Sequence, residues 1–198
     1  MAEPSRLCLV LERVAETVHE PEFVTDAPLV SFEAFVAEHR VYGWVRLDAD
    51  RLTDLLNAHE ELLLANVLVE HLGTGRTISA DEAMVRRSEL VAVRASGPRG
   101  DAALRRETVP HAVVVESGPY RIGGFIHAAP GIAPELRVRG GEPMVPLTEA
   151  WIELRSDDAV TRRRVGTIIV NRDLATRIEL VPVPDAEPSD ERARALSD

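Results

Sequence analysis

The sequence predicts a mainly β protein with two tandem small curved-sheet or barrel repeats, a short N-terminal helix and a disordered acidic C-terminal tail. Three observations predict it: an internal repeat that keeps its order, a glycine at the same place in each copy, and an aliphatic core composition. Apolar residues make up 45% of the 198-residue chain and aromatic residues only 4%, so valine, leucine, isoleucine and alanine fill the core. Valine favours strands because its branched Cβ suits a pleated surface.

The repeat consists of three segments of the first half that return in the same order in the second half. Residues 39–46 align with 120–127, residues 62–70 with 145–153, and residues 84–90 with 168–174. The offset between the copies increases only from 81 to 84 residues, which small loop insertions would explain. A repeat of this kind predicts one structural unit built twice, with Leu64 superposing on Leu147.

The repeat divides the chain into five parts. Each copy is close to the lower size at which a core is stable alone, so the two copies are expected to pack against each other. The parts are an N-terminal extension (1–30), a first β repeat (31–96), a linker (97–106), a second β repeat (107–181) and a tail (182–198).

Gly43 and Gly124 occupy matching positions inside predicted strands. A glycine inside a strand allows tight curvature or a bulge because it lacks a side chain. The aromatic residues that follow, Trp44 and Phe125, are expected to point into equivalent cores. Recurrence of the bend in both copies predicts a curved, barrel-like sheet.

In the first copy the elements follow in order from the N-terminus. Apolar residues three and four apart over 6–19 predict an amphipathic helix, and an alternating pattern of leucines in the same segment leaves a strand open. One or two strands are predicted over 32–47. A short helical turn follows over 50–57, which Asp50 can cap by accepting backbone N–H bonds and Asn57 can end in the left-handed conformation.

The remaining strands are predicted from short apolar runs bounded by turn residues. They cover 62–70 in the first copy, and 112–116, 120–128, 144–154 and 164–171 in the second. Residues 84–94 close the first unit, and residues 173–179 complete the core of the second. From residue 182 onward proline, serine and charged residues dominate, which is typical of disorder.

Composition argues against several classes of function. The net charge of −10 is unfavourable for nucleic-acid binding, which draws its affinity from phosphate neutralisation. All 23 basic residues are arginine, which fits the codon bias of a GC-rich genome. Cys8 is the single cysteine, so an intramolecular disulfide and a cysteine-based zinc site are excluded. No segment approaches the roughly 18 apolar residues that a membrane span needs, and the N-terminus lacks the pattern of a signal peptide. We therefore expect a cytoplasmic bacterial protein without membrane contact.

The sequence contains no recognisable catalytic motif. Residues 73–76 (GTGR) lack the glycine spacing and the following lysine of a phosphate loop, and they are better explained as a turn. The six histidines are scattered without metal-ligand spacing, and no serine lies in a Gly-x-Ser-x-Gly context. We therefore predict no catalytic residues, no metal site and no cofactor.

Arg162, Arg163 and Arg164 form the most concentrated positive charge in the chain, beside a predicted turn at Asp157 and Asp158. One interpretation is a solvated hairpin. The other is contact with an anion or a partner, because guanidinium groups bind anions through two parallel hydrogen bonds. We take these three arginines as the predicted binding site.

Two segments carry a resemblance to a known family. Residues 51–57 (RLTDLLN) followed by a strand resemble the signature of small uncharacterised bacterial β-domains that often occur in tandem, mostly in actinobacteria. Residues 143–150 (PMVPLTEA) followed by 151–153 (WIE) resemble the matching strand of these proteins. The resemblance covers roughly residues 31–181 and implies no activity.

More distantly, the order of helix, bent strands and Leu-Leu-Asn turn is similar to Sm-like barrels. Those barrels form rings, and many of them bind RNA. The chain lacks their full Asp-x-x-Met-Asn loop, so the similarity does not imply RNA binding here.

These observations predict a non-catalytic binding or assembly module that contacts a protein partner or forms a small homo-oligomer. Two alternatives stay open: an Sm-like nucleic-acid-binding protein, and a small-molecule sensor or enzyme with a site between the repeats.

Overall fold

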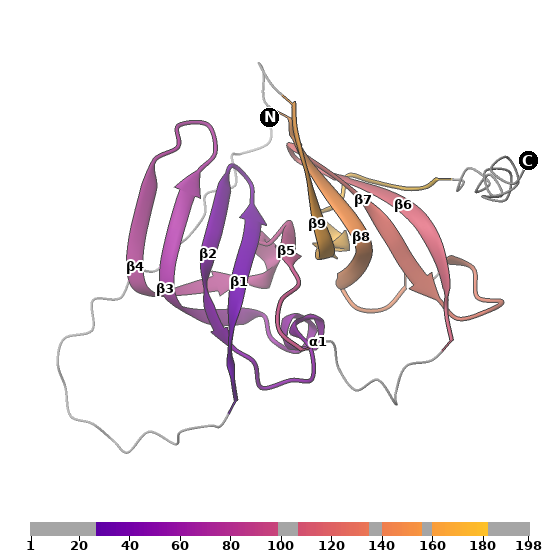
Figure 1. Cartoon of the computed structure of the whole chain (residues 1–198), viewed down its shortest axis with the longest axis horizontal. Coiled ribbons are helices and arrows are strands. Elements are labelled where there is room, and N and C mark those ends of the chain that lie inside the picture. The colour runs from indigo at the N-terminus through magenta and orange to yellow at the C-terminus, as the bar shows by residue number, and fades with distance from the viewer. Residues whose placement is uncertain (1–26, 99–106, 135–139, 156–159, 182–198) are drawn as a thin grey trace, which may run out of the picture.

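The computed structural model describes residues 27–98, 107–134, 140–155 and 160–181. It confirms a mainly β protein, with ten strands in one antiparallel sheet and one short helix among these residues (Figure 1). The predicted N-terminal helix, most of the linker and the predicted disordered tail lie outside the described residues.

The first half of the sheet contains five strands. They are β1 (Leu29–Val36), β2 (His39–Arg46), β3 (Glu61–His71), β4 (Thr77–Arg86) and β5 (Ala92–Arg94), with helix α1 (Leu52–Ala58) between β2 and β3 and the 3-10 turn η1 (Arg87–Glu89) before β5. Helix α1 buries its leucines against the core of this half.

The second half contains five further strands. They are β6 (Val109–Ser117), β7 (Tyr120–Ala128), β8 (Met144–Arg155), β9 (Val160–Asn171) and β10 (Arg177–Leu180), with the 3-10 turn η3 (Arg172–Leu174) before β10.

The strands lie in the order β10-β6-β7-β8-β9-β5-β1-β2-β3-β4. Within each half the fifth strand lies beside the first, and the first to fourth strands follow in chain order. The two halves are not separate sheets, because β9 pairs with β5 and joins them edge to edge. Strands β10 and β4 are the two ends of the sheet.

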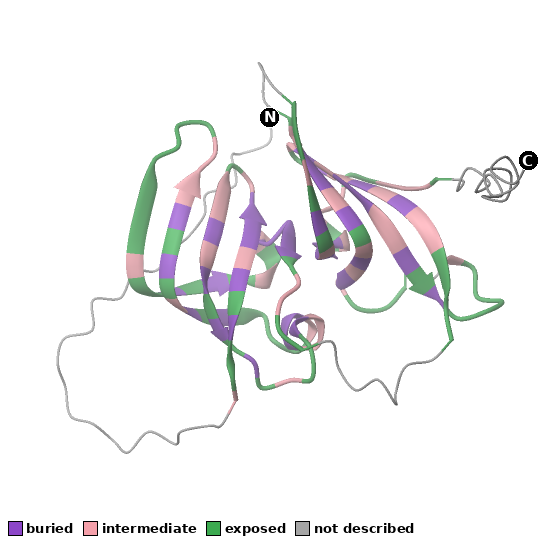
Figure 2. Cartoon of the chain, in the orientation of Figure 1, coloured by how far each residue is buried: buried purple, intermediate pink, exposed green. Residues whose placement is uncertain are grey.

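The buried residues form two apolar clusters, one in each half, and burial alternates along most strands (Figure 2). Both clusters extend across the junction of the halves. Phe35 of β1 belongs to the second cluster, whereas Met144 of β8 and Ile169 of β9 belong to the first. Each half therefore contributes side chains to the core of the other.

Each predicted bend glycine lies at a shift in strand register. The shift is between Tyr42 and Trp44 in β2, and between Gly123 and Phe125 in β7. A Cβ at Gly124 would lie 2.9 Å from the carbonyl oxygen of Thr148, so this strand pair approaches too closely for a side chain.

The expected orientation of the aromatic residues is wrong. Gly43 and Gly124 face the core side, so their neighbours Trp44 and Phe125 face outward, because successive residues of a strand alternate between the two faces. Trp44 is 45% exposed and Phe125 is half-buried outside both core clusters.

Three local predictions also need correction. The residue before α1 is Arg51 rather than Asp50, and it makes no side-chain cap; instead its guanidinium pairs with Asp54 at 2.9 Å. Asn57 lies within the helix rather than ending it. The segment 84–94, predicted to close the first unit, divides into the end of β4, η1 and β5.

The third aligned segment of the sequence is one residue out of register. Val85 lies opposite Leu62, and Val170 lies opposite Val145, the residue aligned with Leu62. Val85 therefore corresponds to Val170, and Met84 corresponds to Ile169 rather than Ile168.

Candidate assembly interface

The three arginines predicted as a binding site all lie in β9, where the structure gives each different surroundings. Arg162 places its guanidinium carbon 3.8 Å from the ring centre of Trp151 on the outer face. Arg163 is on the opposite face of the strand and pairs with Glu33 at 2.5 Å. Arg164 is exposed and lies opposite Trp151 in the ladder. They do not form a single cluster, and Arg163 is part of the junction between the halves.

Glu33 is the centre of an ionic network at that junction. Its side chain, 12% exposed, lies 3.1 Å from Nη1 of Arg94 and 3.7 Å from Nε of Arg40, in addition to its contact with Arg163. Burial raises the pKa of Glu33, but the hydrogen bonds from Arg163 and Arg94 and the charge of Arg40 outweigh it, so the net pKa is lowered. The network ties β1, β2 and β5 of the first half to β9 of the second.

The ladder that pairs β5 with β9 is short and buried. Val93 lies opposite Ile169, and both side chains are 0% exposed. Hydrogen bonds of 3.0 Å close the ladder at its two ends, one from the Asn171 amide to the Val91 carbonyl and one from the Ala95 amide to the Thr167 carbonyl. The junction therefore combines strand pairing with complete burial of its central apolar pair.

Two asparagine side chains secure the junction beside this ladder. The Asn57 amide group of α1 donates to the Met144 carbonyl and accepts from the Met144 amide, both at 3.0 Å. The Asn171 side chain donates to the carbonyl of Arg87 at 3.0 Å. These contacts satisfy backbone groups that strand pairing does not reach.

An aromatic contact joins the halves at Phe35, near the C-terminal end of β1. The rings of Phe35 and Tyr120 meet edge to face with centres 5.7 Å apart. The Tyr120 hydroxyl lies 3.5 Å from the carbonyl oxygen of His39, and burial raises the pKa of Tyr120. Burial, together with the neighbouring His71, lowers the pKa of His39. These groups pack the interface and stay uncharged near neutral pH.

Among the described residues, strands β4 and β10 each have one hydrogen-bonded neighbour, so this part of the chain leaves one edge of each strand unpaired. Strand β4 is exposed over most of its length (Figure 2). Its apolar side chains include Ile78, 62% exposed, and Met84, 37% exposed, with Leu63 of β3 beside Met84 in the ladder. An open strand edge with apolar side chains is a template for pairing with another chain.

The ladder registers show which positions of the open strands correspond to the closed junction. With Met84 matched to Ile169, Ile78 falls on Arg163. At the other edge, Val93 lies opposite Ala34 of β1 and Ile178 lies opposite Val115 of β6. Strands β1 and β6 end at corresponding residues, because Val36 lies opposite His39 and Ser117 lies opposite Tyr120. Counting back from these ends, Ala34 corresponds to Val115. Their ladder partners, Val93 and Ile178, therefore correspond as well. The open edges therefore carry the counterparts of the residues that close the junction.

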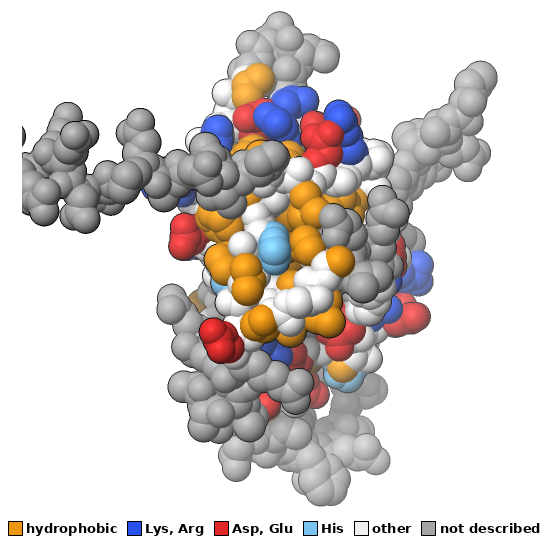
Figure 3. Space-filling view, turned by 90° about the vertical axis from the view of Figure 1, so that its right-hand side faces the viewer, with side chains coloured by type: hydrophobic (Ala, Val, Ile, Leu, Met, Phe, Trp, Pro, Cys, Tyr) orange, Lys and Arg blue, Asp and Glu red, His pale blue; other side chains and the backbone are white. Residues whose placement is uncertain are grey.

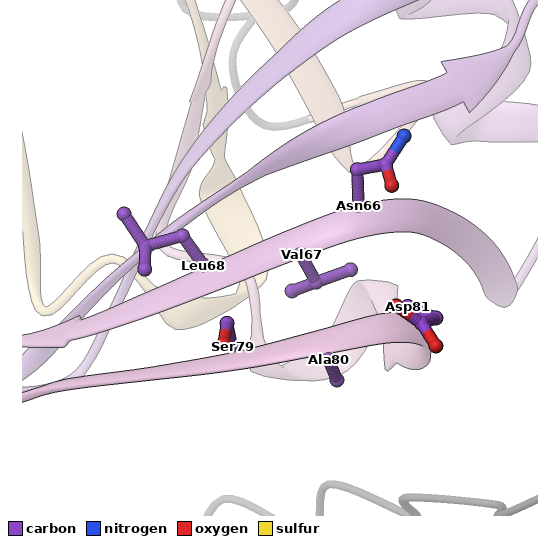
Figure 4. Close-up of a pocket in the computed structure, with 6 residues that line it drawn as sticks. All are labelled: Asn66, Val67, Leu68, Ser79, Ala80 and Asp81. Atoms are coloured by element: carbon purple, nitrogen blue, oxygen red, sulfur yellow. The ribbon is translucent and has the colours of Figure 1, made fainter.

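Two concave regions offer little for small-molecule chemistry. One, of about 420 Å³, is an open groove between β3 and β4, where Asn66 projects away from β4 (Figure 4). The other, of about 430 Å³, lies at η1 and η3, where Arg86 and Arg87 already pair with Glu61 and Glu60. In neither is a nucleophile hydrogen-bonded to a base within the described part of the chain.

One face of the second half carries apolar and charged side chains in separate areas. Figure 3 shows hydrophobic side chains gathered around a histidine, with arginine and acidic side chains together at one end of this face. Among the described residues, no group of three or more histidine, cysteine, aspartate or glutamate side chains is arranged to hold a metal ion. No helix in the described ranges is long and apolar enough to cross a membrane.

Comparison with known proteins adds no relative. No family model, no curated protein and no solved structure matches this chain.

Sequence reasoning missed the two features that define the interface. Glu33 is an isolated acidic residue in an apolar strand, and its partner Arg163 lies 130 residues away. The only sequence signal was the charged residue itself in the middle of the run Ser31 to Val36, where a partner is required for burial. The open strand β4 was not predicted over its first seven residues.

Proposed function

We propose that this chain is a non-catalytic assembly module and that copies of it associate through the open edges of the sheet. The observation that carries the proposal is the contrast between two corresponding positions. Ile169 is fully buried where β9 meets β5, whereas its counterpart Met84 is exposed on β4, which pairs with β3 alone among the described strands. Apolar side chains on an unpaired strand favour association with a further strand.

The proposal includes a fold made of two copies of one five-stranded unit. Support comes from the equal strand order of the halves and from the register shift at each bend glycine. Further support comes from Asn66 and Glu149, which correspond in the ladders and both have a left-handed φ, near 50°. A protein that already joins two such units edge to edge can join further units in the same way.

Sedimentation velocity over a wide concentration range tests the assembly. We expect a discrete small homo-oligomer that dissociates on dilution. The variant Met84→Lys should remain monomeric, because a charge at the centre of the open edge blocks strand pairing. Leu68→Lys is the matched control, since Leu68 is similarly exposed on β3 and corresponds to Trp151, outside the β5–β9 ladder. A monomer at every concentration, or equal behaviour of both variants, would refute self-association through β4.

One cluster favours nucleic-acid binding as a second candidate function. Trp151 lies flat over Gly123, with Arg162 stacked on it and Arg164 opposite. Within the described residues, Arg162 and Arg164 have no ion pair. A guanidinium held flat on an aromatic ring can stack a base on its plane, and a neighbouring arginine can bind the phosphate. Titration with single-stranded RNA at two salt concentrations tests this, and salt-sensitive binding lost in Arg164→Ala would support it.

A further inference from the structure

We infer that the partner of β4 is β10 of a second copy, in the register that β5 and β9 show within the chain. This inference rests on the proposed self-association and names the surface and the alignment that it uses. The contact is head to tail, so one copy presents β4 and the next presents β10.

The alignment follows from the correspondence of the strands. Within the chain, Ala92, Val93 and Arg94 lie opposite Val170, Ile169 and Ile168. When each of these residues is replaced by its counterpart at the open edges, Ile178 of one copy lies opposite Met84 of the next. Arg177 then lies opposite Val85, and Glu179 lies opposite Ala83. The flanking backbone bond from Ala95 to Thr167 becomes a bond from Leu180 to Glu82.

The side chains at these positions suit one another. Ile178 is half-buried and Met84 is partly exposed, and they would form the central apolar pair that Val93 and Ile169 form inside the chain. Removing this apolar surface from water stabilises the contact.

The residues that correspond to the Glu33–Arg163 ion pair give an independent indication that the two open edges are complementary. Inside the chain Glu33 meets Arg163, an acid with a base. The corresponding residues at the open edges are Val114, which is half-buried, and Ile78, which is the more exposed. Both members of the pair have changed from charged to apolar, so the two edges remain complementary.

A head-to-tail contact also covers both edges of the sheet with one kind of junction. A symmetric β4–β4 contact would leave both β10 edges open. Repetition of a head-to-tail contact gives a closed ring when the rotation between copies permits it.

Disulfide cross-linking tests the register. In a Cys8→Ser background, Met84→Cys and Ile178→Cys are placed on separate chains of different mass, which are mixed and oxidised. Directly opposed residues of an antiparallel ladder lie about 5 Å apart, within reach of a disulfide. We expect a covalent heterodimer from this pair and from the second matched pair, Glu82→Cys with Leu180→Cys.

The swapped pair, Met84→Cys with Leu180→Cys, is the control, because diagonal neighbours lie about 7–8 Å apart and cross-link poorly. Equal cross-linking of matched and swapped pairs would overturn the register. Cross-linking of Met84→Cys with itself, in a protein that still assembles, would overturn β10 as the partner and leave self-association standing. Absence of both assembly and cross-links, with circular dichroism showing folded variants, would overturn the proposed function as well.

Discussion

The fourth strands of the two halves occupy corresponding places in the sheet but have different neighbours. Strand β9 lies between β8 and β5, and its Ile169 is fully buried in the core cluster of the first half. Of the strands that the structure describes, β3 alone pairs with β4, and the corresponding Met84 is exposed. The comparison teaches that the burial of a fourth-strand side chain in this fold depends on whether a further strand pairs with that strand.

A second contrast concerns the chemistry at the end of each fourth strand. Arg163 of β9 binds Glu33, whereas Ile78 of β4 lies opposite Val69 of β3 and, within the described residues, meets no residue of the other half. The charged pair favours the internal junction, because placing an apolar residue against Glu33 would remove one of the arginines that compensate this largely buried carboxylate. This difference in charge would distinguish the internal junction from the proposed contact between copies.

The largest effect is expected at Phe35, which belongs to a strand of one half and to the core of the other. Phe35→Ala should lower the free energy of unfolding by about 3–5 kcal/mol, because it empties a fully buried aromatic site against Tyr120. Chemical denaturation measures the change. Phe125→Ala is the control, since its ring faces outward, and an equal loss in both variants would contradict the assignment of Phe35 to the shared core.

The bend glycines should rank next. Gly124→Val should cost about 1–3 kcal/mol through overpacking, because a side chain meets the Thr148 carbonyl at 2.9 Å. Gly43→Val should cost less, since its nearest backbone atom is 3.2 Å away. Gly123→Ala meets the side chain of Trp151 rather than backbone and adds a smaller side chain than valine, so it should also cost less than Gly124→Val. Thermal unfolding ranks the three, and equal losses would contradict a tighter bend in the second half.

The ionic network predicts a smaller effect that depends on pH. Because arginines hold the pKa of Glu33 below its usual value near 4.5, the carboxylate stabilises the fold fully above that pH. This stabilisation is lost as the pH falls through the lowered pKa. Glu33→Gln should therefore cost about 1–2 kcal/mol near neutral pH, since partly exposed arginines are screened by solvent. The variant should also lose less stability than the native chain on acidification.

Arg163 and Arg164 provide the matched test of this network. Arg163→Ala removes a partner of Glu33 and should resemble Glu33→Gln, whereas Arg164→Ala should change stability by less than about 0.5 kcal/mol. Denaturation at two pH values distinguishes them. Equal losses would mean that Arg163 contributes nothing specific to the junction.

Sequence patterns located the elements that have one buried face and clear turns. The predicted strand 120–128 has the bounds of β7, because apolar and polar residues alternate and a glycine turn precedes it. Strand β4 begins at Thr77 and was missed over its first residues, because an edge strand exposed on both faces shows no alternation.

The interface was less predictable, for a physical reason. Strand pairing between β5 and β9 joins segments that are far apart in the chain, and no local pattern specifies which strands meet. The arginines of β9 were noticed as a group, but their division between two faces depends on the strand register. A shift of one residue in the third aligned segment shows the same sensitivity, since it would exchange exposed and buried positions.

The smallest effect is expected at Trp44, and it separates the outward face from the junction. Trp44 corresponds to Phe125, and neither residue takes part in the β5–β9 ladder or belongs to a core cluster. Trp44→Ala should therefore change the free energy of unfolding by less than about 1 kcal/mol, far below the cost of emptying the site of Phe35, and should leave the sedimentation behaviour unchanged. Thermal unfolding and sedimentation of the same sample check both statements. A large loss of stability would place the indole in a core, and a loss of assembly alone would extend the contact surface from the edge of β4 onto the outer face of β2.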